Sequence, residues 1–236
     1  MGFPLEYFTP SNLRHWQLRF GTNGIKDTYE MIKRYRTSPN GCFGCKLHFM
    51  HFKMLFGEKG IEDSFPNAKF VFVRRRDLMA QAVSLAKAKQ TGSWISYQKP
   101  AAEATYSRSE IEKALKDILR DNARWEYLFS RRGWPCYEVY YEDFLERPTD
   151  TITEIGVFLG LEVRPGLNFT FGQLPQRQSD HLNQQFRERY LLEVQESSFA
   201  EELEFLRDIE GIPVTRIALH LLGRIRRKMR QLTGRR

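Results

Sequence analysis

The sequence predicts an α/β fold with a parallel sheet, and two strand-to-helix junctions carry this prediction. Residues 70–73 form a short run of aromatic and β-branched side chains, typical of a buried strand, and the segment after Asp77 has apolar residues at helical spacing. Residues 136–141 repeat this order, since a second such run precedes a helix that Pro148 begins. Strands that alternate with helices are typical of α/β proteins with a parallel sheet.

Two further helical regions follow from the apolar spacing. Most of residues 11–36 is predicted to be helical, with a break at Gly21–Gly24. A long helix is predicted to begin at the Ser107–Glu110 capping box and to end at Gly133. Its apolar stripe predicts packing against the core.

Composition predicts one domain over residues 1–210 and a basic tail over residues 211–236. The chain has 236 residues, 41% of them hydrophobic, which is enough to bury a core. From Arg216 onward there are eight basic residues and no acidic one, so the tail accounts for the whole net charge of +8. Its apolar residues have amphipathic helical spacing. Three interpretations stay open: binding to an anionic membrane surface, binding to a partner groove or RNA, and packing on the body.

The same features set expectations for location and partners. No apolar run is long enough to cross a bilayer and no signal peptide is recognisable, so a cytoplasmic location is expected, with the tail as a means of peripheral attachment to the inner membrane face. Three cysteines argue against a disulfide scaffold. No recognised binding module accompanies the basic charge, so nucleic acid is not an expected partner. The oligomeric state, a homodimer included, stays open.

The strand of residues 70–73 delivers three arginines, Arg74–Arg76, to the start of a helix. The first turn of a helix has unpaired N–H groups, and arginine presents a planar fork to phosphate oxygens, so the junction suits an anion. Ser84 lies two helical turns further on. The alternative interpretation is a solvated charge run, with Ser84 as a small residue that permits close packing.

The spacing of Arg75, Asp77 and Ser84 at this junction resembles the 3′-phosphate site of PAPS-dependent sulfotransferases. The Gln-Ala-Val-Ser84 and Gln90-Thr-Gly-Ser-Trp94 motifs are similar to those of the bacterial trehalose sulfotransferase family. The resemblance covers about Gly2 to Tyr190. It implies a three-layer, P-loop-NTPase-like sulfotransferase fold, with Arg75 and Ser84 on the 3′-phosphate of PAPS. Arg177, in a late Arg-Gln motif similar to the family's nucleotide-closing loop, is implied as a further phosphate ligand.

Glu6 follows Pro4 and is flanked by aromatic residues, in an element closely similar to one in the trehalose sulfotransferase family. That resemblance implies that Glu6 is the general base. Apolar rings close to a carboxylate raise its pKa by desolvation, so we expect a raised pKa at Glu6, which would suit proton abstraction from a sugar hydroxyl. The alternative is an ordinary exposed carboxylate.

The resemblance also implies a feature that this sequence lacks. Family members have a first strand, a loop rich in Ser, Arg, Gly and Thr that binds the 5′-phosphosulfate, and a helix before the element that contains Glu6. Here the N-terminal strand is missing, because the sequence begins at Met1. A piece of a longer protein is the favoured explanation, since loss of a central strand would expose backbone edges and apolar faces. A degenerate relative is the alternative.

Cysteine and histidine recur at every third position between Cys42 and His51. Zinc is disfavoured, because a Cys₂His₂ site needs about a dozen residues between its two pairs and only two separate Cys45 from His48. A redox role and a structural role are the other interpretations. The family resemblance implies a strand here instead, with Lys46 as the residue that neutralises charge on the bridging oxygen of the donor. A lysine at a strand end with no catalytic role is an equally good interpretation.

The acceptor side is predicted to include Gln90, Trp94 and Tyr106. An indole face stacks on sugar rings, and Gln and Tyr bond hydroxyl groups. Packing in the core or a lid is the alternative role for Trp94.

Together these predictions describe sulfuryl transfer from PAPS to a hydroxyl of a carbohydrate or glycolipid acceptor, with PAP as the product and no metal. The alternative function is a catalytically inactive module that binds PAP or another nucleotide and associates with a membrane or partner through its basic tail.

Overall fold

The computed structural model describes residues 4–57, 60–94, 98–162 and 181–210. Arg177 and the basic tail lie outside these residues. The elements in chain order are α1 (Pro10–Phe20), α2 (Ile25–Arg36), α3 (Phe49–Phe56), β1 (Phe70–Arg74), α4 (Leu78–Thr91), α5 (Arg108–Arg132), β2 (Cys136–Tyr140), α6 (Tyr141–Glu146), α7 (Pro148–Leu159), α8 (His181–Gln195) and α9 (Phe199–Glu210).

The chain divides into two compact units, which are described separately. The first unit comprises Met1–Arg76 and Asp121–Leu174, and the second comprises Asp77–Arg120 and Pro175–Arg236. The boundaries fall between β1 and α4 and within α5.

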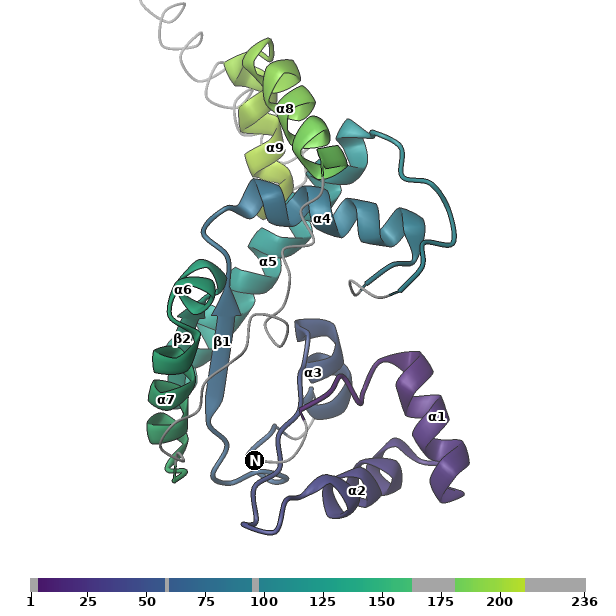
Figure 1. The fold of residues 1–236 in the computed structure, drawn as a ribbon, viewed down its shortest axis with the longest axis vertical. Coiled ribbons are helices and arrows are strands. Elements are labelled where there is room, and N and C mark those ends of the chain that lie inside the picture. The colour runs from purple at the N-terminus through teal and green to yellow at the C-terminus, as the bar shows by residue number, and fades with distance from the viewer. Residues whose placement is uncertain (1–3, 58–59, 95–97, 163–180, 211–236) are drawn as a thin grey trace, which may run out of the picture. The chain divides into compact units, whose positions relative to one another are not determined.

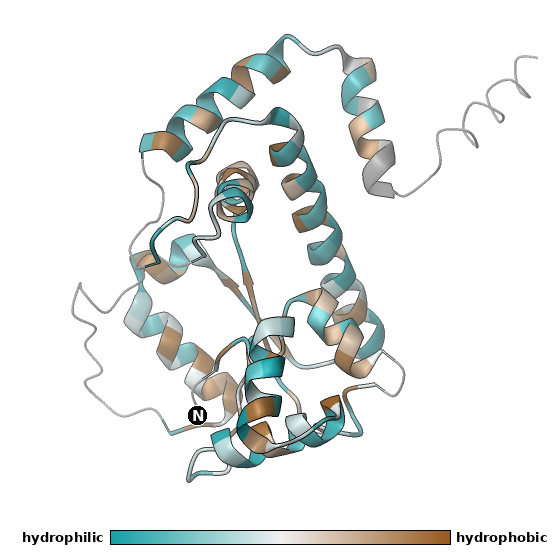
Figure 2. Ribbon diagram, turned by 90° about the vertical axis from the view of Figure 1, so that its right-hand side faces the viewer, coloured by the Kyte–Doolittle hydropathy of each residue, from teal (hydrophilic) through white to brown (hydrophobic). Residues whose placement is uncertain are grey.

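The first unit contains a parallel pair of strands, β1 and β2, in which Phe70 lies opposite Cys136 and Arg74 opposite Tyr140 (Figure 1). Strand β1 is apolar from Phe70 to Val73, whereas β2 has tyrosines and a glutamate beside Cys136 and Val139 (Figure 2). Parallel strands need a long crossover connection, and here α4 and α5 lie between them in the chain. The predicted parallel pairing is confirmed.

Helices cover both faces of this pair of strands. On one face, Phe70 and Phe72 contact Phe129 of α5, with ring centroids 5.4 Å apart in each case. Side chains alternate between the two faces of a strand, so Tyr137 of β2 points to the other face, where its ring lies 5.6 Å from that of Phe158 on α7. The α/β class is therefore observed in the first unit.

An aromatic core holds the N-terminal helices of the first unit together. Tyr7 and Phe8 are each 1% exposed and pack with Leu13 and Trp16 of α1 and with Ile32 of α2. Thr9 caps α1, and Gly21 ends it in the left-handed conformation that glycine adopts without strain. The predicted helical break at Gly21–Gly24 is confirmed.

The second unit has a core of smaller side chains. Ala82, Val83 and Ala86 of α4 pack against Ile111, Ala114 and Ile118 of α5 and Tyr190 of α8. Asp77 caps α4, and its Oδ1 accepts a hydrogen bond from the Ala80 N–H at 2.9 Å.

Two local expectations differ from the structure. The strand implied by resemblance around residues 40–47 is reduced to one isolated parallel bridge between Leu5 and Cys45. Helix α3 follows at Phe49, and helix α6 follows β2 directly, and neither was predicted. Glycine at positions 41 and 44 and proline at 39 weaken a strand. Three phenylalanines and Leu55 on α3 instead pack into an apolar core cluster.

Candidate functional site

The bridge between Leu5 and Cys45 brings two predicted catalytic residues together in the first unit. The Lys46 N–H donates to the Leu5 carbonyl at 3.0 Å, which places Glu6 and Lys46 at neighbouring positions of the paired segments. The Lys46 ammonium lies 2.5 Å from Oε1 of Glu6. The Asn12 side chain donates to the Glu6 carbonyl at 2.6 Å, so the backbone at this position is also held.

His48 completes the cluster from the start of α3. Its Nε2 lies 3.3 Å from Oε1 of Glu6, and its side chain is 57% exposed. An ionised carboxylate can only accept hydrogen bonds, so Nε2 donates, and in the neutral imidazole Nδ1 is then the acceptor. His51, one turn further, packs its ring 5.7 Å from that of His48, and its own Nδ1 is buried with no hydrogen-bond partner in the described part of the chain.

The surroundings of Glu6 lower its pKa to about 2. The hydrogen bond with His48 is the largest cause, and the contact with Lys46 adds to it, whereas burial acts in the opposite direction. The expected raised pKa is therefore wrong. Tyr7 and Phe8 turn into the aromatic core while the Glu6 carboxylate turns toward two nitrogen donors.

The cysteine and histidine residues of this segment form no metal-binding group among the residues that the structure describes. Burial raises the pKa of Cys45 to about 12, so this thiol stays protonated. Within residues 4–57, 60–94, 98–162 and 181–210, no cluster of three or more His, Cys, Asp or Glu side chains has the geometry to hold a metal ion.

The three arginines at the end of β1 have different environments. Arg74 forms ion pairs with Glu126 at 2.7 Å and with Glu138 at 2.6 Å. Arg76 forms a bidentate pair with Asp143, at 2.5 and 2.7 Å. Both therefore have their charge balanced within the first unit.

Arg75 differs from its two neighbours. Its guanidinium lies 4.3 Å from the ring centroid of Tyr141. Among the residues that the structure describes, no carboxylate lies within ion-pair distance of Arg75. Stacking on an aromatic ring leaves the edge of a guanidinium able to donate to an anion.

The sequence model of the Stf0 sulphotransferase family matches residues 2–193. The chain belongs to this family. The match confirms the resemblance seen in the motifs between Gly2 and Tyr190, and the family's description indicates sulfuryl transfer as the chemistry. No curated protein matches the chain.

The sequence predicted further site residues for this Stf0 sulphotransferase. They lie in the second unit or outside the described residues. Ser84 lies on α4, partly buried, whereas Arg75 belongs to the first unit. Arg177 lies outside the described residues. These ligand assignments stay predictions.

The predicted acceptor residues already make contacts inside the second unit. The Gln90 side chain donates to Glu110 and accepts from the Thr105 N–H at 2.9 Å. The Tyr106 hydroxyl donates to Glu193 at 2.7 Å. Trp94 differs, since 55% of its surface is exposed. Their role in acceptor binding stays a prediction.

The sequence did not predict a functional role for His48 in this family member. The regular spacing of cysteine and histidine was the visible signal, and it raised only a disfavoured zinc site, a redox role or a structural role. The spacing of Lys46 and His48 could have indicated this role. They are two positions apart, and residues i and i+2 of an extended segment lie on the same side.

Proposed function

We propose that this Stf0 sulphotransferase transfers a sulfuryl group from PAPS to a hydroxyl of a carbohydrate or glycolipid. The single observation that carries this proposal is the convergence of Glu6, Lys46 and His48 beside the aromatic N-terminal core. The acceptor oxygen attacks sulfur, the bond from sulfur to the bridging oxygen breaks, and PAP leaves. The acceptor proton must pass to a base and the leaving phosphate must be stabilised.

His48 is the base in this proposal, and Glu6 is the carboxylate that orients it. A carboxylate with a pKa of about 2 is a weak base toward a sugar hydroxyl. A histidine with one nitrogen bonded to a carboxylate presents its other nitrogen as a proton acceptor, an arrangement that recurs in hydrolases. After transfer, Glu6 stabilises the imidazolium.

Lys46 and Arg75 supply positive charge. The Lys46 ammonium is 62% exposed, so it can exchange part of its contact with Glu6 for the charge that builds on the bridging oxygen. Arg75 is proposed to bind the 3′-phosphate, because its two neighbours are neutralised by carboxylates while it stacks on Tyr141. Ser84 and Arg177 are proposed as further ligands of the same phosphate on the strength of the family motif alone.

The test is transfer of radiolabelled sulfate from PAPS to a panel of sugars and glycolipids, together with calorimetric titration of PAP. Transfer to at least one acceptor is expected, with PAP bound to the resting protein. PAP binding without transfer to any acceptor would favour the inactive nucleotide-binding module. Absence of both would overturn both functions.

The identity of the base is tested by the pH dependence of kcat/KM. If His48 takes the proton, kcat/KM should fall on acidification at pH values where Glu6, with its pKa of about 2, is still ionised. If Glu6 were the base, its low pKa would keep the rate level down to about pH 4. A value of kcat/KM that stays constant down to about pH 4 would therefore indicate that Glu6, and not His48, is the base.

A further inference from the structure

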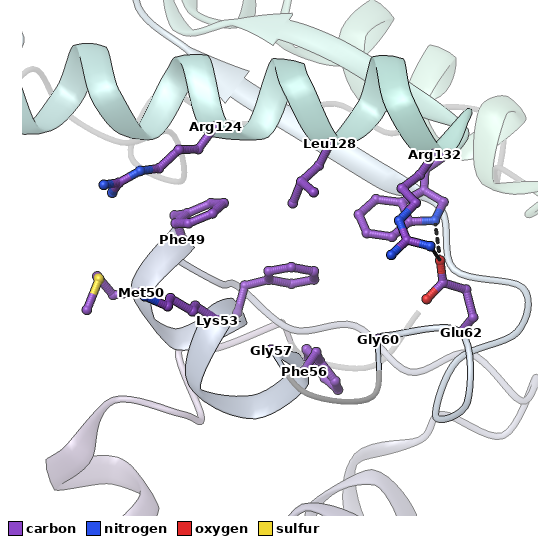
Figure 3. A pocket seen from close by; sticks show the side chains of 12 residues that line it. Phe49, Met50, Lys53, Phe56, Gly57, Gly60, Glu62, Arg124, Leu128 and Arg132 are labelled. Atoms are coloured by element: carbon purple, nitrogen blue, oxygen red, sulfur yellow. Dashed lines mark hydrogen bonds and ion pairs between the residues drawn. The ribbon is translucent and has the colours of Figure 1, made fainter. Parts of the chain in front are cut away.

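A pocket in the first unit is lined by none of the proposed transfer residues. It has a volume of 540 Å³ and lies between α3 and residues 124–132 of α5 (Figure 3). Glu6, Lys46 and His48 do not line it. Small-molecule pockets of proteins typically measure about 300 to 1,000 Å³, so the size suits a small organic ligand.

Two helix faces make the apolar wall of this pocket. Phe49, Phe52 and Phe56 recur along one side of α3, and Leu128 faces them from α5. Phe52 and Phe56 are buried in the aromatic core, whereas Met50 at the mouth is 61% exposed. The wall is therefore apolar, and the end at Met50 is exposed to solvent.

Charge is distributed unevenly along the pocket. Arg124 and Lys53 point to the end where Met50 lies, and Arg132 and Glu62 lie at the other end (Figure 3). At that second end the charges compensate, since Glu62 accepts from the Trp134 indole at 2.9 Å and lies 3.9 Å from Arg132. The Met50 end is cationic.

The two cations at the Met50 end differ in their contacts. The Arg124 guanidinium lies 5.2 Å from the ring centroid of Phe49 and pairs with Asp121 at 3.0 Å. Within the described ranges, Lys53 has no carboxylate at ion-pair distance. An apolar wall that ends in a cation with no ion-pair partner among the described residues matches a ligand with an apolar tail and an anionic head.

We propose that this pocket binds a single-chain amphiphile with an anionic head group. The tail lies along Phe49, Phe52 and Leu128, and the head group contacts Lys53 and Arg124. None of the proposed transfer residues lines this site, so it adds a lipid-binding property to the protein.

The test is calorimetric titration of the whole chain with decanoate. Decyltrimethylammonium has the same tail with the opposite charge, and acetate has the same head without the tail. Decanoate is expected to bind once per chain. Decyltrimethylammonium should bind at least about tenfold more weakly because the charged contact is lost, and acetate at least about tenfold more weakly because the apolar contact of the tail is lost. Equal binding of the cationic probe, or no binding of decanoate, would overturn the proposal.

Substitutions of pocket residues test whether decanoate binds in this pocket. The double variant Lys53→Gln, Arg124→Gln is expected to weaken decanoate binding about tenfold or more. Leu128→Trp should weaken it by filling the pocket. Arg131→Gln is the matched control, because Arg131 is exposed on the same helix and does not line the pocket. Binding that responds equally to the control would overturn the proposed location.

A bilayer surface offers the same chemistry as a free amphiphile, and a sedimentation experiment distinguishes the two. Vesicles of phosphatidylcholine with one third phosphatidylglycerol are mixed with the chain and with the Lys53→Gln, Arg124→Gln variant. The proposal expects free decanoate to bind and the substitutions to leave any vesicle binding unchanged. Vesicle binding that depends on these two residues, without decanoate binding, would overturn it.

Discussion

The cluster around Glu6 in the first unit and the polar residues Gln90 and Tyr106 in the second unit use similar groups in different ways. Glu6, Lys46 and His48 meet at side chains that are 30%, 62% and 57% exposed. The amide of Gln90 and the hydroxyl of Tyr106 are instead bonded to partners of their own unit. Polar groups that converge and stay accessible can act on a ligand, whereas groups that already have partners stabilise the fold.

The same contrast separates the arginines at the end of β1. Arg74 and Arg76 hold carboxylates of the first unit, while Arg75 stacks on Tyr141. A cation whose charge is already balanced gains little from a phosphate, because it must first give up its partner. Substitutions can test both contrasts. The largest losses of transfer or of PAP binding are expected at His48 and Arg75.

Replacement of His48 by alanine is expected to have the largest effect. Loss of a general base lowers kcat/KM by about 10² to 10⁴-fold. The measurement is sulfate transfer at saturating PAPS, with PAP titration to show that the nucleotide still binds. His48→Gln keeps a donor for Glu6 but cannot take a proton, so wild-type-like transfer by this second variant would remove His48 from the proton transfer.

Replacement of Arg75 by alanine is expected to weaken PAP binding by about 10 to 100-fold, the effect of losing one or two charge-assisted hydrogen bonds. Calorimetric titration with PAP measures it. Arg76→Ala is the matched control, since it removes the same charge one residue away but breaks a pair with Asp143. If the two variants lose the same affinity, the charge of the junction as a whole attracts PAP and Arg75 has no special role.

The ionised form of Glu6 is expected to contribute to the free energy of unfolding. This contribution depends on pH and is smaller than the effects of the two preceding substitutions. The pKa of Glu6 is lowered to about 2 from 4.5, so the ionised form is stabilised in the folded state. This stabilisation is present above about pH 4.5 and is lost as the pH falls toward 2. Glu6→Gln should reduce the free energy of unfolding at pH 7 by about 1 kcal/mol, after allowance for solvent screening.

Urea unfolding at pH 7 and at acid pH measures this prediction. The difference between the wild-type chain and Glu6→Gln should shrink as the pH approaches 2, because protonated Glu6 no longer attracts Lys46 and His48. A difference in unfolding free energy that stays constant from pH 7 to pH 3 would show that ionisation of Glu6 does not stabilise the folded state.

Replacement of Tyr106 by phenylalanine is expected to have the smallest effect. Burial, with the bond to Glu193 as a further cause, raises the pKa of Tyr106 to about 12, which indicates a hydroxyl that stays protonated and bonded. Its loss should lower the thermal midpoint by about 2 to 4 °C and leave the acceptor KM unchanged. A raised KM with an unchanged midpoint would instead assign Tyr106 to acceptor binding.

The fold was predictable where residues close together in the chain specify a helix or strand by themselves. The apolar run at residues 70–73, the cap at Asp77 and the Pro148 start each specify their element within a few residues of the chain, and each is observed. Helix α3 was missed because its aromatic residues give no polar face to mark its period. The bridge between Leu5 and Cys45 joins segments about forty residues apart, and no local signal specifies it.

The sequence by itself determined the family and the strand-to-helix junction at Arg74–Arg76, because these depend on residue types at fixed spacing, and it predicted roles for Glu6 and Lys46 that stay predictions. Only the tertiary structure decided that Glu6 is an ion-paired carboxylate with a low pKa, that His48 is its partner, and that Arg75 differs from Arg74 and Arg76. The physical reason is that a pKa and the availability of a charge depend on which groups meet in space, and residues forty or more positions apart supply those groups here.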